Sequence, residues 1–330
     1  MDLVMITMAL LAAASLAGAQ CLDDTRRTSL ITLRSPKGSL TAVIDPAHGA
    51  NLVGLELDGR ELLYRGLNFC PVTGWDGKAP ILWPATGRNY AADPAGGVAA
   101  FGWILAGQRM PMPIHGFARD RAWNVVARHR NSLTVELNDD AQSRALYPFG
   151  FRLRLIYTLS ANGLTLDHQV FAAKGQRNMP FSIGNHVTFV THAGASISTV
   201  PTRRITLDSA GRPTGIVPQA RLDREPVNGF ARLETVSLAG YPRVARAAFD
   251  LGNGVRIAFT QSASGASPRA DPIRYNLWGD PDAGYFAVEP WYGLQNALAD
   301  GRGVVLLPAG QRFDWHMTMR ISRSPAHTRK

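Results

Sequence analysis

The sequence predicts an all-β protein folded as one large antiparallel β-sandwich, and three observations carry this prediction. Asn-Gly and Asp-Gly pairs recur along the chain, and such pairs are the strongest short signal for a β-hairpin turn. Apolar and polar residues alternate beside several of these pairs, as in strands with one buried face. Proline, glycine and asparagine interrupt the chain too often for long amphipathic helices. The pairs are Asp58-Gly59, Asp76-Gly77, Asn162-Gly163, Asn228-Gly229, Asn253-Gly254 and Asp300-Gly301.

The longest alternating stretch runs from Phe149 to Val170 and is broken only at Asn162-Gly163. Apolar side chains take every second position from Phe149 to Leu159, and the same spacing resumes after the turn. This pattern predicts a long two-stranded ribbon with one buried face, and it places His168 in the core. By contrast, the Gly-, Ala-, Ser- and Pro-rich stretches 87–113 and 262–272 are predicted to be loops.

The first residues have the features of a secretory signal peptide. Residues 3–16 are almost entirely apolar, and Ala17-Gly18-Ala19 supplies the small residues that a signal peptidase reads. The apolar run is shorter than the about 20 residues of a membrane-spanning helix. We therefore expect residues 1–19 to be removed after Ala19, with export to the periplasm or the medium and residues 20–330 forming a single domain. A lipoprotein anchored through Cys21 stays open, although Gln20 is an unfavourable residue before a lipidated cysteine.

Composition excludes several classes of protein. The formal net charge is +10, but the arginines are scattered along the chain and form no basic stripe, so we expect no nucleic-acid partner. No later apolar run is long enough to span a membrane. The two cysteines, Cys21 and Cys70, are too few for a disulfide scaffold or a four-cysteine zinc site. In an oxidising compartment they either pair or remain separate thiols.

Two apolar stretches each contain one residue suited to proton transfer. His186 lies in the strand-like stretch 179–189, where a histidine fits either an acid–base role or a satisfied core position. Glu289 stands between Val288 and Pro290. Burial in such a setting raises the pKa of a carboxyl group towards that of a working general base. The alternative for Glu289 is an ion pair with one of the many arginines.

Four further residues are candidate ligand contacts. Trp291 offers a flat face on which the C–H side of a sugar ring can stack. Arg88 and Arg119 carry several fixed donors, which suit vicinal hydroxyls or a carboxylate, and His115 lies shortly before Arg119. Each arginine, taken alone, also fits a solvated surface charge.

Three other kinds of site lack a supporting motif. His115, His186 and Glu289 would make a metal-ligand set, but no local pair at H-x-x-x-H spacing anchors it, so we expect no metal. The chain has no G-x-S-x-G elbow for a Ser-His-Asp triad. It also has no glycine-rich loop between a strand and a helix, so we expect no nucleotide cofactor.

Six segments, taken in this order, resemble the aldose 1-epimerase (galactose mutarotase-like) family. Each is moderately specific, and their joint order over most of the mature chain is strongly specific. They are Gly49-Ala50-Asn51-Leu52 with the following Asp58-Gly59 turn, Pro80-Ile81-Leu82-Trp83-Pro84 with Gly87-Arg88, Ile114-His115-Gly116-Phe117-Ala118-Arg119, Tyr147-Pro148-Phe149, Pro180-Phe181-Ser182-Ile183-Gly184-Asn185-His186, and Val288-Glu289-Pro290-Trp291.

The resemblance implies a β-sandwich of the supersandwich type with a sugar in a cleft on one face. It also implies a cofactor-independent isomerase that interconverts the α and β anomers of an aldose. In this family scheme Glu289 would take the proton from the anomeric hydroxyl, and His186 would protonate the ring oxygen. The ring would then open, rotate about C1–C2 and close again. His115, Arg88 and Arg119 would hold hydroxyl groups or polarise the ring oxygen.

The resemblance is less informative about the substrate. The sequence around His186 resembles the branch acting on hexose phosphates or unknown sugars more than the galactose branch. Neither Asp223 nor Asp271 makes a convincing counterpart of the sugar-binding aspartate of that branch. For an exported protein, a free sugar or an oligosaccharide end is favoured over a hexose phosphate. Two other functions stay open: a non-catalytic carbohydrate-binding protein, and a glycan lyase or hydrolase, which would need a second carboxylate near Glu289.

Overall fold

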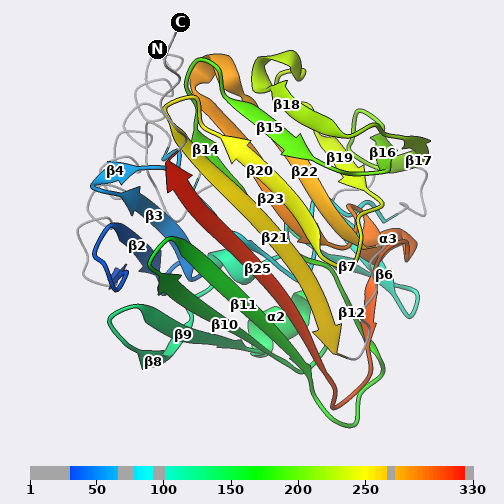
Figure 1. Cartoon of the computed structure of the whole chain (residues 1–330). Helices are drawn as coiled ribbons and strands as arrows, with labels where there is room; N and C mark the ends of the chain where they lie inside the picture. The colour runs from blue at the N-terminus through cyan, green and yellow to red at the C-terminus, as the bar shows by residue number, and fades with distance from the viewer. Residues whose placement is uncertain (1–29, 66–77, 92–100, 266–271, 324–330) are drawn as a thin grey trace, which may run out of the picture.

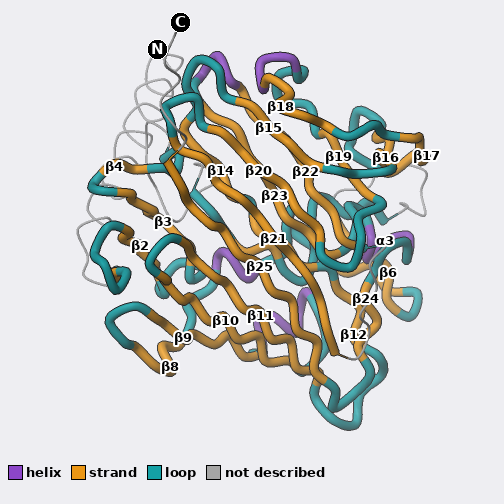
Figure 2. Tube along the Cα trace, in the orientation of Figure 1, coloured by secondary structure: helices purple, strands orange, loops and turns teal. Residues whose placement is uncertain are grey.

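Two large antiparallel sheets pack face to face in the computed structural model, which describes residues 30–65, 78–91, 101–265 and 272–323 (Figure 1). Strands dominate the trace, and the helices are short (Figure 2). The predicted all-β, antiparallel sandwich is confirmed. The predicted signal peptide, Cys21, Cys70, Asp76-Gly77 and Asp271 lie outside the described residues.

Among the described residues, nine strands form the sheet at the front of Figure 1. In order of pairing they are β18 (Leu222–Pro226), β15 (Ser196–Thr199), β20 (Ala245–Asp250), β21 (Val255–Gly265), β25 (Arg312–Arg323), β11 (Gly163–Ala172), β10 (Phe151–Ser160), β9 (Ser132–Asn138) and β8 (Asn124–Arg128).

The second sheet contains eight strands within the described part of the chain. Seven of them follow one another in the order β17 (Pro213–Pro218), β16 (Arg203–Leu207), β19 (Val236–Ala239), β22 (Ile273–Asp280), β23 (Tyr285–Tyr292), β13 (Ile183–Asn185) and β5 (Ile81–Leu82). The eighth, β14 (Val187–Val190), also pairs with β23.

Smaller elements complete the described structure. The remaining strands are β1 (Ile31–Arg34), β2 (Leu40–Asp45), β3 (Asn51–Leu57), β4 (Arg60–Glu61), β6 (Gly102–Leu105), β7 (Gln108–Pro111), β12 (Met179–Phe181) and β24 (Val305–Leu307). The helices are α2 (Ala141–Leu146) and α3 (Ala297–Asp300), with 3-10 turns η1 (Ala118–Asp120), η2 (Val227–Gly229) and η3 (Pro281–Ala283). No helix in the described ranges is long and apolar enough to cross a membrane.

Three of the predicted hairpin turns are confirmed and two are wrong. Asp58-Gly59 joins β3 to β4 with positive φ at both residues, as a type I′ turn requires. Asn162-Gly163 joins β10 to β11, and Asn253-Gly254 joins β20 to β21. Asn228-Gly229 instead lies in η2. Asp300-Gly301 ends α3, where Gly301 takes the left-handed conformation that commonly follows a helix.

The predicted ribbon is confirmed as β10 and β11, which pair over their full lengths with Leu155 opposite His168. His168 is buried, as expected. The two predicted loops need correction, because β6 and β7 form a hairpin inside 87–113, and β21 continues to Gly265 inside 262–272. Pairing with β25 supplies the hydrogen-bond partners for that part of β21, and local composition does not reveal a partner so distant in sequence.

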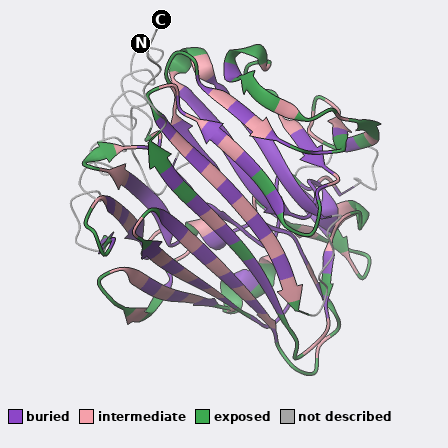
Figure 3. Ribbon diagram, in the orientation of Figure 1, coloured by how far each residue is buried: buried purple, intermediate pink, exposed green. Residues whose placement is uncertain are grey.

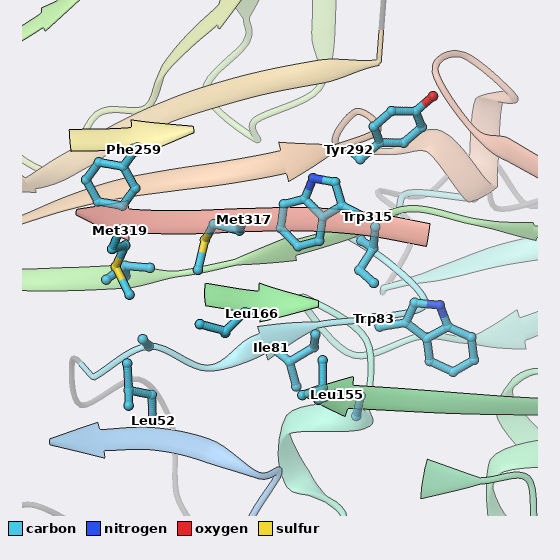
Figure 4. Packing of buried hydrophobic residues seen from close by; sticks show 14 of the residues in the cluster. Leu52, Ile81, Trp83, Leu155, Leu166, Phe259, Tyr292, Trp315, Met317 and Met319 are labelled. Carbon is cyan, nitrogen blue, oxygen red and sulfur yellow. The ribbon is translucent and has the colours of Figure 1, made fainter. Parts of the chain in front are cut away.

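The hydrophobic core fills the space between the two sheets. Along β21 of the front sheet buried residues alternate with partly exposed ones, and β25 alternates similarly over most of its length (Figure 3). Trp315 and Met317 of β25 project into this interior, which they share with Ile81 and Trp83 (Figure 4).

The alternation along β23 places two candidate functional side chains away from this core. Phe286, Val288 and Tyr292 belong to the core cluster. Because successive side chains in a strand point to opposite faces, Glu289 and Trp291 lie on the other face of the sheet. The core residues of β23 therefore fix the direction of Glu289.

Candidate functional site

A cavity of about 800 Å³ lies on this outer face and contacts all six residues proposed from the sequence. They come from separate segments: Arg88 follows β5, His115 precedes η1, Arg119 lies in η1, and His186 lies between β13 and β14. Glu289 and Trp291 are both on β23. The structure therefore brings together residues that are up to about 200 positions apart in the chain.

Cross-strand register brings His186 and Glu289 together. Val187 of β14 pairs with Val288 of β23 in antiparallel register. His186 directly precedes Val187 and Glu289 directly follows Val288, so these two residues come opposite each other. The backbone N–H of His186 donates to Pro80 O at 3.0 Å. His186 Nε2 lies 3.5 Å from Glu289 Oε1, and the two residues are only 6% and 3% exposed. An imidazole and a carboxyl group thus face each other with little access to water.

Neighbouring side chains orient both groups. Trp291 Nε1 donates to Glu289 Oε2 at 3.1 Å, and His186 Nδ1 lies 3.1 Å from Thr188 Oγ1. Gly184 is opposite Trp291 in the sheet, and a Cβ at Gly184 would come within 2.6 Å of the indole ring. A glycine is required there because any side chain would displace Trp291 and, with it, the hydrogen bond to Glu289.

His115 is held in an unusual backbone conformation with φ of 65°. Its N–H donates to Gly87 O at 2.9 Å, and the N–H of Gly87 donates to His115 Nδ1 at 3.0 Å. Because Nδ1 accepts a hydrogen bond, a neutral His115 carries its proton on Nε2. Left-handed conformations of non-glycine residues persist where the surroundings enforce them, often at functional sites. His115 therefore offers a fixed N–H donor.

The aromatic rings of the site are in mutual contact. The ring centroid of His115 lies 5.7 Å from that of His186 and 5.8 Å from that of Trp291, with the planes nearly perpendicular in both pairs. These edge-to-face contacts leave little freedom for either imidazole to rotate.

Burial sets the protonation of the three titratable groups. It raises the pKa of Glu289 well above its usual value, opposed by the hydrogen bond from Trp291. It lowers the pKa of His186 to about 3, with a further contribution from the positive charge of Arg119. The pKa of His115 is also well below its usual value, first because of burial and then because of His186, Arg119 and Arg88. At neutral pH both imidazoles are therefore neutral, and the Glu289 carboxyl holds its proton more tightly than an ordinary glutamate does.

The Glu289–His186 pair is close enough for its two members to share one proton. Burial favours the neutral form of both groups, so a proton shared by the pair favours Glu289, and its transfer to His186 creates a carboxylate beside an imidazolium. One member can then accept a proton from a ligand atom while the other donates one to a neighbouring atom.

The two arginines differ in their surroundings. Arg88 is exposed, with its guanidinium carbon 5.5 Å from the ring centroid of Phe101. Arg119 is more buried, with Nε 3.6 Å from the Asp120 carboxylate. That Nε makes no hydrogen bond to the described residues. Arg119 therefore retains a donor for a ligand, close enough to His186 to disfavour its imidazolium form.

Several cavity residues were not found from the sequence. Trp278 of β22 lies with its ring centroid 5.7 Å from that of His186. Gln295 is buried, and its Oε1 has no hydrogen-bond partner in the described structure. Asp208 also lines the cavity, whereas Asp223 lies on β18 and pairs with Arg221. Gln295 lies shortly after Glu289 in the sequence, and this proximity could have indicated it as a cavity residue. Asp208 and Trp278 lie in no local sequence pattern that would have indicated them.

A metal-binding arrangement is not formed by the described residues, in which no three His, Cys, Asp or Glu side chains converge suitably. The carboxyl and imidazole groups of the cavity are instead arranged as a pair. Proton transfer is the chemistry that this geometry offers directly.

Comparison with solved structures shows the fold. The Slr1438 protein from Synechocystis sp. PCC 6803 aligns with a TM-score of 0.73 and 21% identity, covering 90% of this chain and 97% of that one. A galactose mutarotase related enzyme from Lactobacillus acidophilus aligns with a TM-score of 0.71 and 21% identity, covering 90% and 98% of the two chains. The galactose mutarotase-like fold expected from the motifs is therefore confirmed.

Sequence comparison identifies the family. Protein LacX from Lactococcus lactis subsp. lactis, in its plasmid-encoded form, is 25% identical over 242 residues, covering 69% of this chain and 77% of that protein. The family model described as aldose 1-epimerase matches residues 29–228, a range that includes Arg88, His115, Arg119 and His186. The family resemblance drawn from the six segments is confirmed: the chain belongs to the aldose 1-epimerase family.

Proposed function

We propose that the protein is a cofactor-independent mutarotase that interconverts the α and β anomers of an aldose. The observation that carries this proposal is the buried pair formed by His186 Nε2 and Glu289 Oε1, 3.5 Å apart. The anomeric hydroxyl oxygen and the ring oxygen of an aldose are bonded to the same carbon, C1. An acid and a base that act on these two atoms must therefore lie close together, as this pair does.

In the proposed reaction, Glu289 as carboxylate takes the proton from the anomeric hydroxyl. The O–H electrons form the C1 carbonyl, the bond from C1 to the ring oxygen breaks, and His186 as imidazolium protonates that oxygen. Rotation about C1–C2 then presents the opposite face of the aldehyde. On ring closure His186 takes the proton back and Glu289 returns its proton to the anomeric oxygen, so the enzyme is regenerated.

The surroundings suit these roles. A carboxyl group whose pKa is raised by burial is a stronger base, once ionised, than an ordinary glutamate. The Trp291 hydrogen bond fixes one oxygen of Glu289 and leaves the other beside His186. His115, with its proton on Nε2, is proposed to donate to the sugar, as are Arg88 and Arg119. Trp291 adds an apolar face for the ring.

The proposal is tested by following anomer interconversion of free aldoses and sugar phosphates by polarimetry or NMR. At least one sugar should equilibrate faster than it does spontaneously. Glu289→Gln should lower that catalysed rate by about 10²–10⁴-fold, the usual contribution of a general acid or base. Glu225→Gln is a matched control, because Glu225 is an exposed carboxylate on β18. Sugar binding with no rate above the spontaneous one would indicate a carbohydrate-binding protein instead.

We also propose that the protein is exported, on the basis of the apolar run and the Ala17-Gly18-Ala19 segment. Mass spectrometry of the protein produced in a bacterial host should find Gln20 as the first residue in the periplasmic or secreted fraction. An intact Met1 confined to the cytosol would contradict export.

A further inference from the structure

The cavity extends well beyond the Glu289–His186 pair. Besides Glu289 on β23, its lining includes Trp278 on β22, Thr235 directly before β19, and Leu207 at the end of β16. These four strands are consecutive neighbours in the sheet. Neighbouring strands are about 4.8 Å apart, so a lining that extends over four strands is about 14 Å long in this direction. We call the part lined by Leu207, Asp208, Ser209, Glu234, Thr235 and Trp278 the far half.

One wall of the far half is the turn between β16 and β17, and it is firmly held. Asp208 Oδ1 accepts hydrogen bonds from the backbone N–H groups of Ala210 and Arg212, each at 2.9 Å. The hydroxyl of Tyr90 donates to Ala210 O at 2.6 Å, which ties the turn to the segment that carries Arg88. This wall is therefore in place before any ligand binds.

The opposite wall is the segment from Leu233 to Thr235, and it is also fixed by hydrogen bonds. The N–H of Leu233 donates to Gly279 O at 2.9 Å, and Leu233 O accepts from Trp278 Nε1 at 3.0 Å. Leu233 has φ of 60°, a conformation that a leucine keeps only where its surroundings enforce it. Both walls are thus preorganised, which reduces the cost of ordering a ligand between them.

The chemistry of the far half differs from that of the Glu289–His186 end. Arg88 and Arg119, the basic residues among the described lining, both act electrostatically on His115. The far half instead presents the carboxylate of Glu234 and the hydroxyls of Ser209 and Thr235. Both oxygens of Asp208 are already bonded, Oδ1 to the backbone of its own turn and Oδ2 to Arg212 Nε at 2.7 Å. The carboxylate and hydroxyls of Glu234, Ser209 and Thr235 accept hydrogen bonds from hydroxyl donors, and the Glu234 carboxylate would repel an anionic ligand.

Two side chains connect the halves. Trp278 contacts His186 edge-to-face and also faces the cavity, so its ring can pack against the apolar side of a sugar. Gln295 is 7% exposed, and its Oε1 is buried without a hydrogen-bond partner among the described residues. An unpaired buried acceptor is costly, and a ligand hydroxyl would satisfy it.

We propose that the far half is a second sugar-binding subsite, and that the substrate is the reducing end of a neutral oligosaccharide of two or more units. This inference rests on the proposed mutarotase function, which requires C1 of the reducing unit to lie beside Glu289 and His186. The remainder of the substrate then extends along the cavity. Its next unit meets Trp278 and the hydrogen-bond acceptors of the far half, which favour an uncharged sugar.

The test compares each monosaccharide with its own disaccharides. Catalysed anomer interconversion is measured for glucose and its 1,2-, 1,3-, 1,4- and 1,6-linked disaccharides, and for galactose and its disaccharides, after subtraction of the spontaneous rate. We expect kcat/KM for at least one disaccharide to exceed that of its monosaccharide by about tenfold or more, as one additional hydrogen bond to a charged group would give.

Two variants localise the effect. Ser209→Trp, at an exposed position of the turn, should fill the far half and reduce the disaccharide-to-monosaccharide ratio of kcat/KM to about one. Glu234→Gln should lower the same ratio severalfold, whereas Glu225→Gln, outside the cavity, should leave it unchanged.

The possible failures are distinguishable. If monosaccharides equal or exceed every disaccharide, or if Ser209→Trp leaves the ratio unchanged, the second subsite is overturned and the mutarotase function stands. If no sugar of either kind is interconverted above the spontaneous rate, the mutarotase function falls and this inference falls with it.

Discussion

His168 and His186 are both buried histidines on strands or strand ends, and burial lowers the pKa of each to about 3. Their partners differ. His168 Nδ1 donates to Trp315 O at 3.1 Å, and its Nε2 accepts from Asn185 Nδ2 at 2.9 Å. His186 has Thr188 Oγ1 beside one nitrogen and the Glu289 carboxyl beside the other. Burial and pKa therefore do not distinguish a structural histidine from a candidate for proton transfer.

The chemistry of the partners makes the distinction. A carbonyl oxygen and an amide group do not exchange protons at ordinary pH, so they fix His168 as one neutral tautomer. A carboxyl group with a raised pKa can exchange a proton with His186. The two sites are adjacent, because Asn185, which holds His168, directly precedes His186. His168 is accordingly an anchor for the segment that carries His186.

The largest expected effect comes from His186. His186→Gln should lower the catalysed anomer interconversion by about 10²–10⁴-fold, because the acid of the proposed reaction is lost. The urea midpoint of unfolding should change little, since a glutamine side chain can occupy the position of the imidazole beside Thr188. Polarimetry and urea unfolding on the same preparation check both statements. A variant that unfolds readily but keeps its specific activity would assign His186 to the core instead.

His168 should show the converse pattern. His168→Ala leaves Trp315 O and Asn185 Nδ2 without their partner and creates a cavity, so the free energy of unfolding should fall by about 3 kcal/mol. The catalysed rate of the folded fraction should fall less than about tenfold, because proton transfer itself is untouched. Denaturant titration gives the stability. Loss of activity without loss of stability would contradict the structural role.

The pH dependence of stability should report both histidines. Each has a folded pKa near 3 and an ordinary unfolded value of 6.5, so the unfolded chain binds more protons between these limits. Stability is therefore lost as pH falls from about 6.5 towards 3, by up to about 1.4 kcal/mol per pH unit for each histidine. His168→Gln should flatten this slope by about one proton in urea titrations between pH 4 and 6.5. An unchanged slope would mean that His168 is not held neutral.

Glu289 contributes with the opposite sign. Its folded pKa is raised above the ordinary value of 4.5, so above that pH the unfolded chain has released a proton that the folded protein retains. Its contribution to stability is therefore lost as pH rises towards the folded pKa. Glu289→Gln, which should be slow in the proposed reaction, should consequently be more stable than the natural protein at neutral pH.

The smallest effect is expected at Trp291. Trp291→Phe removes the Nε1–H that bonds Glu289 Oε2 but keeps an aromatic ring. Because that hydrogen bond lowers the pKa of Glu289, its loss should move the Glu289 limb of the kcat/KM–pH profile to higher pH. The rate at neutral pH should fall by about tenfold, as the loss of one hydrogen bond to a charged group predicts. A profile that does not move would exclude Trp291 as a positioning residue for Glu289.

The sequence by itself determined the fold class and most of the candidate residues. Period-two alternation from Phe149 to Val170 predicted the ribbon and the burial of His168, because strand side chains point alternately to opposite faces. Glu289 and Trp291 were recognisable because a carboxyl group in an apolar strand and a neighbouring indole are locally unusual. Such signals are contained in adjacent residues and need no knowledge of the tertiary structure.

The tertiary structure decided what those residues face. The pairing of Val187 with Val288 sets His186 beside Glu289 across about 100 positions of sequence, and no local pattern encodes that register. The same holds for Asp208 and Trp278, which reach the cavity through the order of β16, β19, β22 and β23 in the sheet. Asn228-Gly229 is a case in which the local pattern predicted the wrong conformation: the pair is typical of a hairpin turn, but it lies in η2. Local residue patterns therefore indicate which conformations and roles are possible for a residue. Long-range strand pairing decides among these possibilities, because pairing and burial determine which groups the residue contacts.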